Sequence, residues 1–496
     1  MSKHFSPEQI KRRNLWMYPL GTVGRDMMYS LFTNFILTYV MFTRQLTAAQ
    51  LTAITAIMVA ARVFDALNDP LMGNIIERTR TRFGKYKPWL AIGILATSGV
   101  IALTFNSRLQ GWSFIAFFAG MYFLFSIAYT MHDISYWGMT VSLSSDADAR
   151  NQYTSRATLF AGIGGAVASM LIPMFTTGGM TLGGNAQTAY GIIALIFSVI
   201  GPLFLCFTIF GVRETRQVSA EKAPSIGLKK IFATIKGNDQ LRWIAVIFLF
   251  HQLGSGLVAA GLCSTYVYLA FGYEGGMYAL FNTIGLLATG VIMMVFPMLS
   301  RRLTRKQMMD VMMLANVIGS VIMLAAGLIL KGSAQFVTMV VGYMIANIGQ
   351  YCFYLMMMIS IFNTVEYNEL LHGARDEAII TSLRPFLTKL SSAIIVALTS
   401  LTYIVFGVTG VTNRISEMEN AAANGLISEA DKLASIGEAI GAVQPWQTIG
   451  LLLCLTVLPC VLLRVSHVLY KKHYKLDEKE YARICAELAA RQEVQA

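Results

Sequence analysis

Two aspartates, Asp65 and Asp69, stand four residues apart in an apolar stretch, with Asn68 between them. In a helix this spacing places both carboxylates on one face, with Cβ atoms about 6 Å apart. Carboxylates this close repel each other in a medium of low dielectric, so either one binds a proton or a cation lies between them. Oxygens of these three side chains suit a hard cation such as sodium. The alternative is a simple ion pair of Arg62 with Asp65, which leaves the charge of Asp69 unexplained.

A second group, Thr130, Asp133 and Trp137, follows helical spacing and shares one stripe of a later apolar stretch. A carboxylate accepts hydrogen bonds from sugar hydroxyls, and an indole stacks on the apolar face of a sugar ring, so this pair is suited to sugar binding. The alternative for Trp137 is a residue of the aromatic belt at the membrane interface. His132 points to another side of the helix, where we expect a core histidine whose hydrogen bonds are satisfied.

Charged side chains occur at only a few positions inside the apolar stretches. A charge at the centre of a membrane-spanning helix costs about 2.5–3.5 kcal/mol, so it normally faces a cavity or a partner. Lys389 has no acid nearby on its own stretch, which predicts a partner on another helix. The complete set is Arg25, Asp26, Arg62, Asp65, Asp69, Asp133, Arg156, Arg384 and Lys389.

The composition indicates a membrane protein. Of 496 residues, 55% are apolar and only 13% are charged, whereas soluble proteins contain about 25% charged residues. The net charge of +12 is expected of basic loops on the cytoplasmic side, so it does not predict nucleic-acid binding. The six cysteines lack the spacing of a disulfide framework or a metal site. No phosphate-binding loop or hydrolase motif is present, so we predict neither an enzyme nor a cofactor.

Twelve stretches are long and apolar enough to cross a bilayer as helices, which takes about 20 residues. They are 18–43, 49–76, 88–106, 112–143, 157–177, 188–212, 243–271, 275–299, 308–330, 335–362, 379–408 and 446–469. The basic stretch 213–242 separates two predicted six-helix halves, 1–212 and 243–470. A Thr-Tyr-Val triplet at 38–40 recurs at 265–267, and a basic loop recurs at the same offset, as in transporters built from repeats.

The basic residues alternate between the two sides of these spans, which predicts that both termini lie in the cytoplasm of a cell-membrane protein. Most of them fall at 11–13, 78–87, 150, 213–242, 301–306 and after 471. We expect the outside loop 409–445 to form a surface helix pair without chemistry. In the tail, 471–496, Leu476, Ile484 and Leu488 predict a helix that lies along the membrane surface.

Several motifs resemble those of the glycoside–pentoside–hexuronide:cation symporters, a family of the major facilitator superfamily. The segments ARVFDALNDPLMG at 61–73 and RTRTRFGKYKPW at 78–89 resemble its signature. GRD at 24–26, YTMHDISYW at 129–137 and the stretch 366–393 are similar to further family motifs. The resemblance extends over nearly the whole chain and implies the major facilitator fold, with twelve transmembrane helices in two six-helix halves.

The resemblance also implies a function and a site. It implies a symporter that couples uptake of a sugar or glycoside to inward flow of Na⁺, or of Li⁺ or H⁺. We expect the protein to function in the lipid bilayer as a monomer, although the sequence leaves its oligomeric state open. The implied cation ligands are Asp65, Asn68, Asp69 and Thr130, with Asp133 close by. The implied sugar contacts are Arg25, Asp26, Asp133, Trp137 and Arg156, with Lys389 linking the two sites and Tyr354 in place of a tryptophan found in a well-known member.

The substrate stays open among neutral galactosides, pentosides and hexuronides. Arg384 and Pro385 replace neutral polar residues of the family; an arginine there favours an acidic sugar, unless it faces the loop. A sodium-coupled lysolipid carrier of the same fold is the nearest alternative function. A membrane-embedded enzyme and a sugar sensor without transport are more distant ones.

Overall fold

The computed structural model describes residues 6–144, 147–214, 228–259, 261–374 and 376–495, and within these ranges the chain is helical, without strands. The chain forms two compact units. Unit 1 contains residues 1–223, 267–280 and 403–443, and unit 2 contains residues 224–266, 281–402 and 444–496. The segments 267–280 and 403–443 follow the central stretch in sequence but belong to the unit that contains the first helices.

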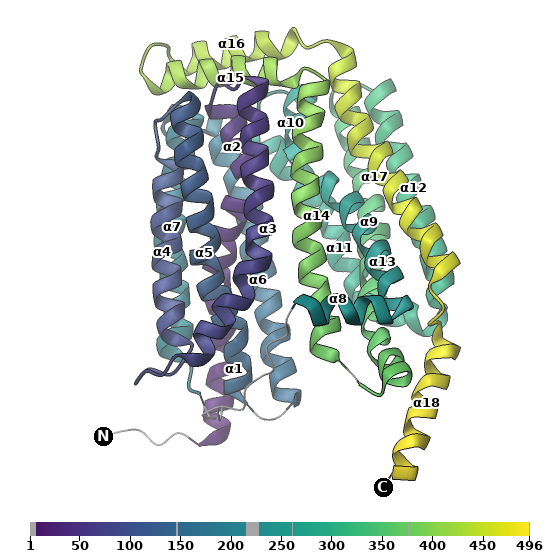
Figure 1. The fold of residues 1–496 in the computed structure, drawn as a ribbon. Helices are drawn as coiled ribbons and strands as arrows, with labels where there is room; N and C mark the ends of the chain where they lie inside the picture. Colours follow the sequence, from purple (N-terminus) through teal and green to yellow (C-terminus); the bar gives the residue numbers. More distant parts are fainter. Residues whose placement is uncertain (1–5, 145–146, 215–227, 260, 375, 496) are drawn as a thin grey trace. The chain divides into compact units, whose positions relative to one another are not determined.

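Unit 1 is built mainly from the first seven helices, two short 3₁₀ helices and a helical hairpin from late in the chain (Figure 1). Its helices are α1 (Pro7–Asn34), α2 (Ile36–Thr43), α3 (Ala48–Arg78), α4 (Lys87–Phe105), α5 (Gly111–Leu143), α6 (Ala147–Thr176), η1 (Gly178–Met180), η2 (Leu182–Gly184), α7 (Ala186–Gly211), α15 (Val408–Ala423) and α16 (Glu429–Gly441).

Unit 2 is also helical, and its core contains methionine, leucine and isoleucine side chains. Its helices are α8 (Leu228–Gly237), α9 (Asp239–Ala259), most of α14 (Glu377–Val405), α12 (Arg305–Ile329), α13 (Gly332–His372), α17 (Pro445–His473) and α18 (Glu478–Gln495). The two units share α10 (Gly261–Phe271) and α11 (Gly275–Arg302).

Eleven stretches of the described chain are long and apolar enough to cross a membrane, which makes this a multi-pass membrane protein. The remaining predicted span is the first, 18–43, which is divided at Phe35 into α1 and α2. It is less apolar than the others because α1 carries Arg25 and Asp26 within it. The predicted all-helical fold is confirmed, and the count of twelve is consistent with these helices.

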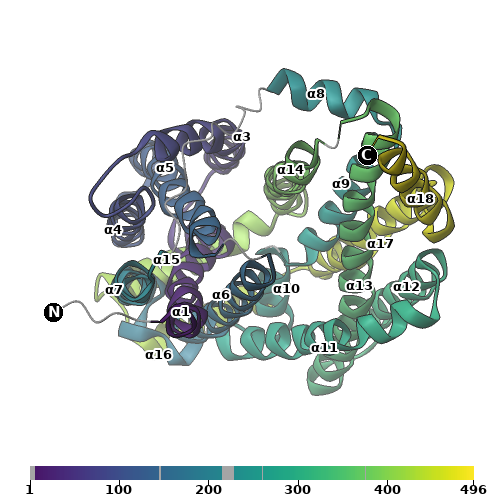
Figure 2. The ribbon, with the colours of Figure 1, turned by 90° about the horizontal axis from the view of Figure 1, so that it is seen from below.

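The helices of unit 1 that carry the predicted site residues pack closely together. Figure 2 shows α1 beside α6 and α7, and α3 beside α5, in agreement with the contacts of these helices. A Cβ atom on Gly24 would lie only 2.7 Å from the carbonyl oxygen of Ile200 on α7. Gly164 of α6 abuts the backbone of Val23 just as tightly. These two glycines therefore allow α1 to approach both α6 and α7 closely. Arg25 and Asp26 directly follow Gly24, so this packing fixes where they lie.

The predicted helix pair at 409–445 is confirmed as the α15–α16 hairpin, and it is attached to unit 1 by polar contacts. The Asn413 side chain accepts a hydrogen bond from the backbone N–H of Leu46 and donates one to the carbonyl of the same residue, both at 2.8 Å. Asn420 donates to the carbonyl of Thr43 at 3.2 Å. Figure 1 shows the hairpin across the ends of α2 and α3. It is thus an integral part of unit 1.

The predicted tail helix is α18, and its apolar stripe packs against unit 2. Ile484 of α18 is fully buried in the core of unit 2, Leu476 is 1% exposed, and Leu488 packs against the same core. The tail is further held by Lys306, which pairs with Asp477 at 3.3 Å. The apolar stripe predicted from the sequence therefore covers α13, and a position of this helix along the membrane surface stays a prediction.

The central stretch 213–242 contains more structure than a loop. Helix α8 lies within it, and α9 begins at Asp239, four residues before the predicted start of the seventh span. Residues 215–227 lie outside the described part of the chain.

Candidate functional site

Asp65 and Asp69 of α3 face two hydroxyl side chains of α5. Asp65 accepts a hydrogen bond from the hydroxyl of Ser126, and Asp69 accepts one from Thr130 at 3.3 Å. The partners are separated by the same 61 positions in both pairs. The two helices therefore run side by side in one direction, and successive turns form two carboxylate–hydroxyl pairs, one above the other.

The ion pair of Arg62 with Asp65 is also present, with 3.8 Å between Nη1 and Oδ2. Both residues are 9% exposed. This pair accounts for one carboxylate only, because Asp69 faces Thr130 one turn further along α3. The two interpretations of the sequence are thus compatible, because Arg62 pairs with Asp65 whereas Asp69 contacts a hydroxyl of α5.

Asn68 lies between the two acids, and its side-chain nitrogen is buried without a hydrogen-bond partner among the described residues. The nitrogen and oxygen of an amide are interchangeable by a half-turn, so the amide oxygen fits the same position. In that orientation the amide oxygen occupies the position at which the nitrogen has no hydrogen-bond acceptor. An oxygen there would serve a cation, so the residues present fit the predicted ligand set of two carboxylates, an amide and a hydroxyl.

Ser126 is a site residue that the sequence analysis missed. It stands four residues before Thr130 and therefore belongs to the stripe of α5 that Thr130, Asp133 and Trp137 define. The signal was available, but a serine in an apolar helix is common because its hydroxyl often donates to its own backbone.

Removing the hydroxyl of Ser126 is expected to weaken activation by the cation. A hydrogen bond to a charged group contributes about 1.5–3 kcal/mol, so Ser126→Ala should raise the cation concentration for half-maximal sugar uptake by about tenfold or more. Ser135 is the matched control, because it lies on the same helix, is fully buried and has no hydrogen-bond partner for its hydroxyl among the described residues. Cation titrations that are alike for Ser126→Ala and Ser135→Ala would contradict the assignment.

Arg25 of α1 joins two further carboxylates. Its guanidinium lies 3.1 Å from Asp26 and 3.1 Å from Asp133 of α5, and the residue is 2% exposed. The Asp26 and Asp133 side chains keep 21% and 35% of their surfaces exposed. A buried arginine thus holds two acids whose side chains stay partly exposed.

Aromatic rings complete this cluster. The Arg25 guanidinium lies 4.6 Å from the ring centre of Tyr136 and 5.5 Å from that of Trp137. Tyr18 stacks on Tyr136 with ring centres 4.4 Å apart and donates a hydrogen bond to its carbonyl. A cation over aromatic faces is stabilised by the ring electrons. The rings therefore position both the guanidinium and the indole that the sequence assigned to sugar stacking.

The described contacts form two separate groups, each with a formal charge of −1: the α3 cluster of Arg62, Asp65 and Asp69, and the α1 cluster of Arg25, Asp26 and Asp133. An acidic excess inside a membrane protein favours binding of a cation.

Arg156 is placed differently from the other predicted sugar ligands. Its guanidinium lies 5.3 Å from the ring centre of Trp16 and donates to the Leu15 carbonyl at 3.4 Å. His132 is fully buried as expected, but neither ring nitrogen has a hydrogen-bond partner among the described residues. The expectation of a satisfied histidine is wrong: the imidazole ring packs against the ring of Tyr129, with ring centres 4.6 Å apart, which supplies no acceptor to its nitrogens.

The predicted residues of unit 2 lie on two helices. Arg384 of α14 donates a hydrogen bond to the Tyr354 hydroxyl of α13 at 2.8 Å. Two residues that the sequence predicts to depart from the pattern of related proteins therefore contact each other. Lys389 lies on α14, one turn after Arg384, and is partly buried. Its role as a link between cation and sugar sites stays a prediction.

Known proteins place the chain in a family of transporters. Residues 17–478 match the family model "MFS/sugar transport protein". A lactose permease of Lactobacillus helveticus is 28% identical over 79% of the chain and 62% of its own length, so the chain spans less than two thirds of that relative. A raffinose carrier protein of Pediococcus pentosaceus is 25% identical over 95% of the chain and 70% of its own length. A solved bacterial homolog of the lysosomal transporter Spinster covers 96% of the chain and is itself covered to 98%, with a TM-score of 0.65 at 13% identity, which shows a shared fold. The chain belongs to the MFS/sugar transport protein family, within the glycoside–pentoside–hexuronide symporters of the major facilitator superfamily.

Proposed function

We propose that this protein is a symporter that couples the entry of a sugar or glycoside to the entry of Na⁺, Li⁺ or H⁺. One observation carries the proposal: a single stripe of α5 contacts both the α3 cluster (Arg62, Asp65 and Asp69) and the α1 cluster (Arg25, Asp26 and Asp133). Ser126 and Thr130 face the acids of α3, whereas Asp133 pairs with Arg25 of α1. The stripe from Ser126 to Trp137 is about 16 Å long, at 1.5 Å per residue. A cation at one end and a sugar at the other would therefore be connected by one rigid helix.

The acidic excess supplies a reason for coupling. A cation between Asp65 and Asp69 removes their mutual repulsion and orders Thr130, which lies one turn from Asp133 on α5. The ordered α5 then presents Asp133 and Trp137 to the sugar in a fixed geometry. Since linkage is reciprocal, the sugar must tighten cation binding by the same factor.

The sugar would be held by charge-assisted hydrogen bonds and by stacking. Asp26 and Asp133 accept from hydroxyls, the Arg25 guanidinium donates to them, and Trp137 offers its ring face. Lactose and raffinose, after which the two relatives are named, are glycosides rich in such hydroxyls. For Arg156, Tyr354 and Lys389, a role in sugar binding rests on the resemblance to the family alone.

We place the protein in the cell membrane with both termini in the cytoplasm, because the basic loops fall on one side of the spans. Uptake would then proceed by alternating access, in which the binding site opens to one side at a time. We expect the monomer to be the functional unit, and we expect transport without chemical change of the sugar.

The proposal is tested by uptake into proteoliposomes. A panel of labelled neutral galactosides, pentosides and hexuronides is offered under an imposed inward gradient of Na⁺, Li⁺ or H⁺, and without any gradient. We expect at least one glycoside to accumulate above its external concentration only with one of the gradients. Equal equilibration with and without gradients, or accumulation of lysolipids in place of sugars, would refute sugar symport.

Shortening the indole at position 137 is expected to weaken sugar binding specifically. Aromatic packing contributes about 0.5–1.5 kcal/mol beyond burial, so Trp137→Leu should raise the KM for sugar about three- to tenfold, whereas Trp137→Phe should retain most of the affinity. Trp112 of α5 is 60% exposed and provides the control substitution Trp112→Leu. An unchanged KM in Trp137→Leu would assign Trp137 to the membrane interface.

A further inference from the structure

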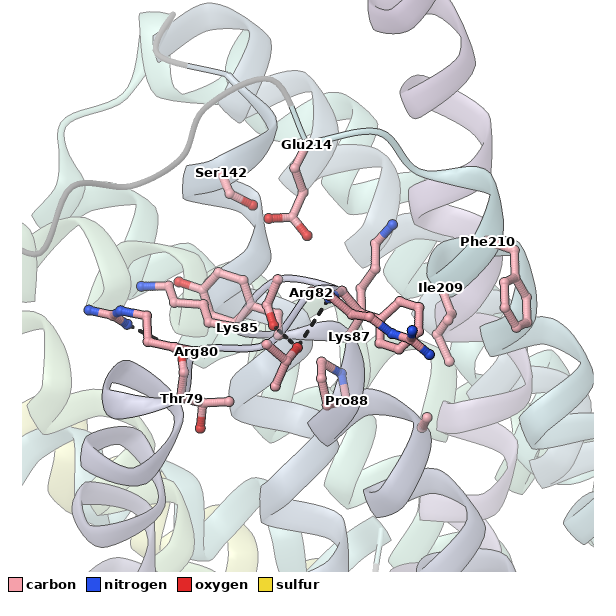
Figure 3. A pocket seen from close by; sticks show the side chains of 15 residues that line it. Thr79, Arg80, Arg82, Lys85, Lys87, Pro88, Ser142, Ile209, Phe210 and Glu214 are labelled. Atoms are coloured by element: carbon pink, nitrogen blue, oxygen red, sulfur yellow. Dashed lines mark hydrogen bonds between the residues drawn. The ribbon is translucent and has the colours of Figure 1, made fainter. Parts of the chain in front are cut away.

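A large basic pocket lies at the end of unit 1 where α3 ends and α4 begins. Its volume is about 1190 Å³. The loop 79–86 forms one side, and Ile209, Phe210 and Glu214 at the end of α7 form another. Figure 3 shows the basic side chains of the loop around this space, with the Glu214 carboxylate on the other side of it. None of these residues belongs to the charged clusters of α1, α3 and α5.

The loop is a defined turn. Thr81 donates to the carbonyl of Gly84 at 2.7 Å and accepts from the N–H of Phe83 at 3.2 Å. Gly84 adopts a φ of +89°, which strongly favours glycine. The indole N–H of Trp89 donates to Thr79 at 2.8 Å and ties α4 to the end of α3. The basic side chains thus project from a backbone that is held in place before any ligand arrives.

Four cations line the pocket, and none has a carboxylate within 4.0 Å in the described part of the chain. They are Arg80, Arg82, Lys85 and Lys87. Glu214 is the one carboxylate among the described residues that line the pocket, so these side chains carry a formal charge of +3. Lys87 donates instead to the carbonyl of Val212 at 3.0 Å. The pocket therefore has the charge and the donors to bind an anion.

An exposed apolar stripe leads along α7 to the same pocket. Val199, Leu203, Phe207 and Phe210 recur at helical spacing and are 60%, 60%, 44% and 77% exposed. Phe83 of the loop is 60% exposed beside them in the pocket lining. In a membrane such a stripe faces acyl chains, so the cations lie at the level of the lipid headgroups.

We propose that this pocket binds the headgroup of an anionic phospholipid, with its acyl chains along the exposed stripe of α7. The ligand chemistry is a phosphate monoanion, which the arginine forks and the lysines would hold by charge-assisted hydrogen bonds. Basic pockets between membrane helices on the cytoplasmic side are known lipid headgroup sites. A lipid fits better than a free phosphate because the apolar stripe continues from the pocket.

The test is binding of phosphatidylglycerol to the purified full-length protein, measured by native mass spectrometry during titration. Arg82→Gln/Lys85→Gln removes two of the pocket cations. Lys472→Gln/Lys479→Gln makes the same charge change at two exposed lysines of α17 and α18. We expect phosphatidylglycerol to bind the pocket variant about tenfold or more weakly, and the control and wild type alike. Phosphatidylcholine should bind all three proteins equally.

A variant that is expected to strengthen lipid binding distinguishes a change in the pocket from a loss of folding. Glu214→Gln removes the carboxylate that shares the pocket, so it should strengthen phosphatidylglycerol binding several-fold, which an unfolded protein would not do. Millimolar inorganic phosphate or glycerol 3-phosphate should leave lipid binding unchanged. Equal lipid binding by pocket and control variants would overturn the proposal. So would displacement of the lipid by either soluble phosphate, since that would assign the pocket to a free anion.

Discussion

Asp69→Asn is expected to abolish the stimulation of sugar binding by cations while leaving the fold intact. Asn is the same size as Asp and still accepts the hydrogen bond from Thr130, so packing is retained. The formal charge of the α3 cluster (Arg62, Asp65 and Asp69), however, changes from −1 to zero, and the repulsion that a cation relieves disappears. Coupling between two ligands of one protein typically amounts to 5–150-fold in affinity, and we expect this factor to approach one in the variant.

Asp69 is a cleaner target than Asp65. Asp65 pairs with the buried Arg62 at 3.8 Å and accepts from Ser126, so its replacement also leaves an arginine less compensated. A loss of folding in Asp65→Asn would therefore be uninformative about cation binding. Glu77 lies on the same helix and is exposed, so Glu77→Gln makes the same chemical change away from the cluster.

Calorimetric titration of the purified protein with sugar measures the effect directly. The titration is performed without added cation, with Na⁺, with Li⁺ and at several pH values, on the wild type, Asp69→Asn and Glu77→Gln. The wild type and Glu77→Gln should show tighter sugar binding with one of the cations, and Asp69→Asn with none. If Asp69→Asn responded to the cation as strongly as Glu77→Gln does, the cation would have to bind elsewhere.

The second large effect is expected at Lys432, where replacement by Met should release the α15–α16 hairpin from unit 1. Lys432 and Glu419 form an ion pair at 3.5 Å, and both side chains are completely buried. Glu419 also accepts from the N–H of Ala186 at the start of α7, at 2.6 Å, and Lys432 donates to the carbonyl of Gly184 at 2.7 Å. The pair thus joins both helices of the hairpin to the beginning of α7.

Breaking one half of such a pair leaves the other charge buried without compensation. Burial raises the pKa of the Glu419 carboxyl, and Lys432 and the Ala186 N–H act in the opposite direction. Without Lys432, the carboxylate must bind a proton or the hairpin must open to water. The loss of one partner from a buried pair typically costs about 3–5 kcal/mol. Glu419→Leu together with Lys432→Met should recover part of that loss, because no charge then remains buried.

Hydrogen–deuterium exchange resolved by mass spectrometry distinguishes release of the hairpin from global unfolding. In Lys432→Met, amides of α15 and α16 should exchange about two to three orders of magnitude faster, since 1.4 kcal/mol corresponds to a factor of ten. Exchange in α1, α3 and α5 should stay as in the wild type. Arg414→Met is the control, because Arg414 is an exposed cation of the same hairpin. Exchange in α15 and α16 that is equally slow in both variants would show that the buried pair does not hold the hairpin.

Much of the molecule was predictable from local properties of the sequence. The helices follow from apolar stretches, and the facing of Asp65 with Asp69, or of Thr130 with Asp133, follows from helical periodicity within one segment. The helix pair at 409–445 and the apolar stripe of the tail were recognisable for the same reason. Such patterns depend on neighbours a few positions apart, which one helix brings together whatever surrounds it.

Which side chains meet across helices was decided by packing alone. Periodicity fixes the direction of a side chain about its own helix axis, but not the partner helix or the register. Close contacts at Gly24 and Gly164 bring α1 against α6 and α7, and Arg25 then bridges Asp26 and Asp133. The same packing turns Arg156 toward Trp16. The buried pair of Glu419 and Lys432, and the burial of Ile484 against unit 2, likewise depend on surfaces that distant segments provide. A charge or an apolar stripe is removed from water only when residues of those segments cover it.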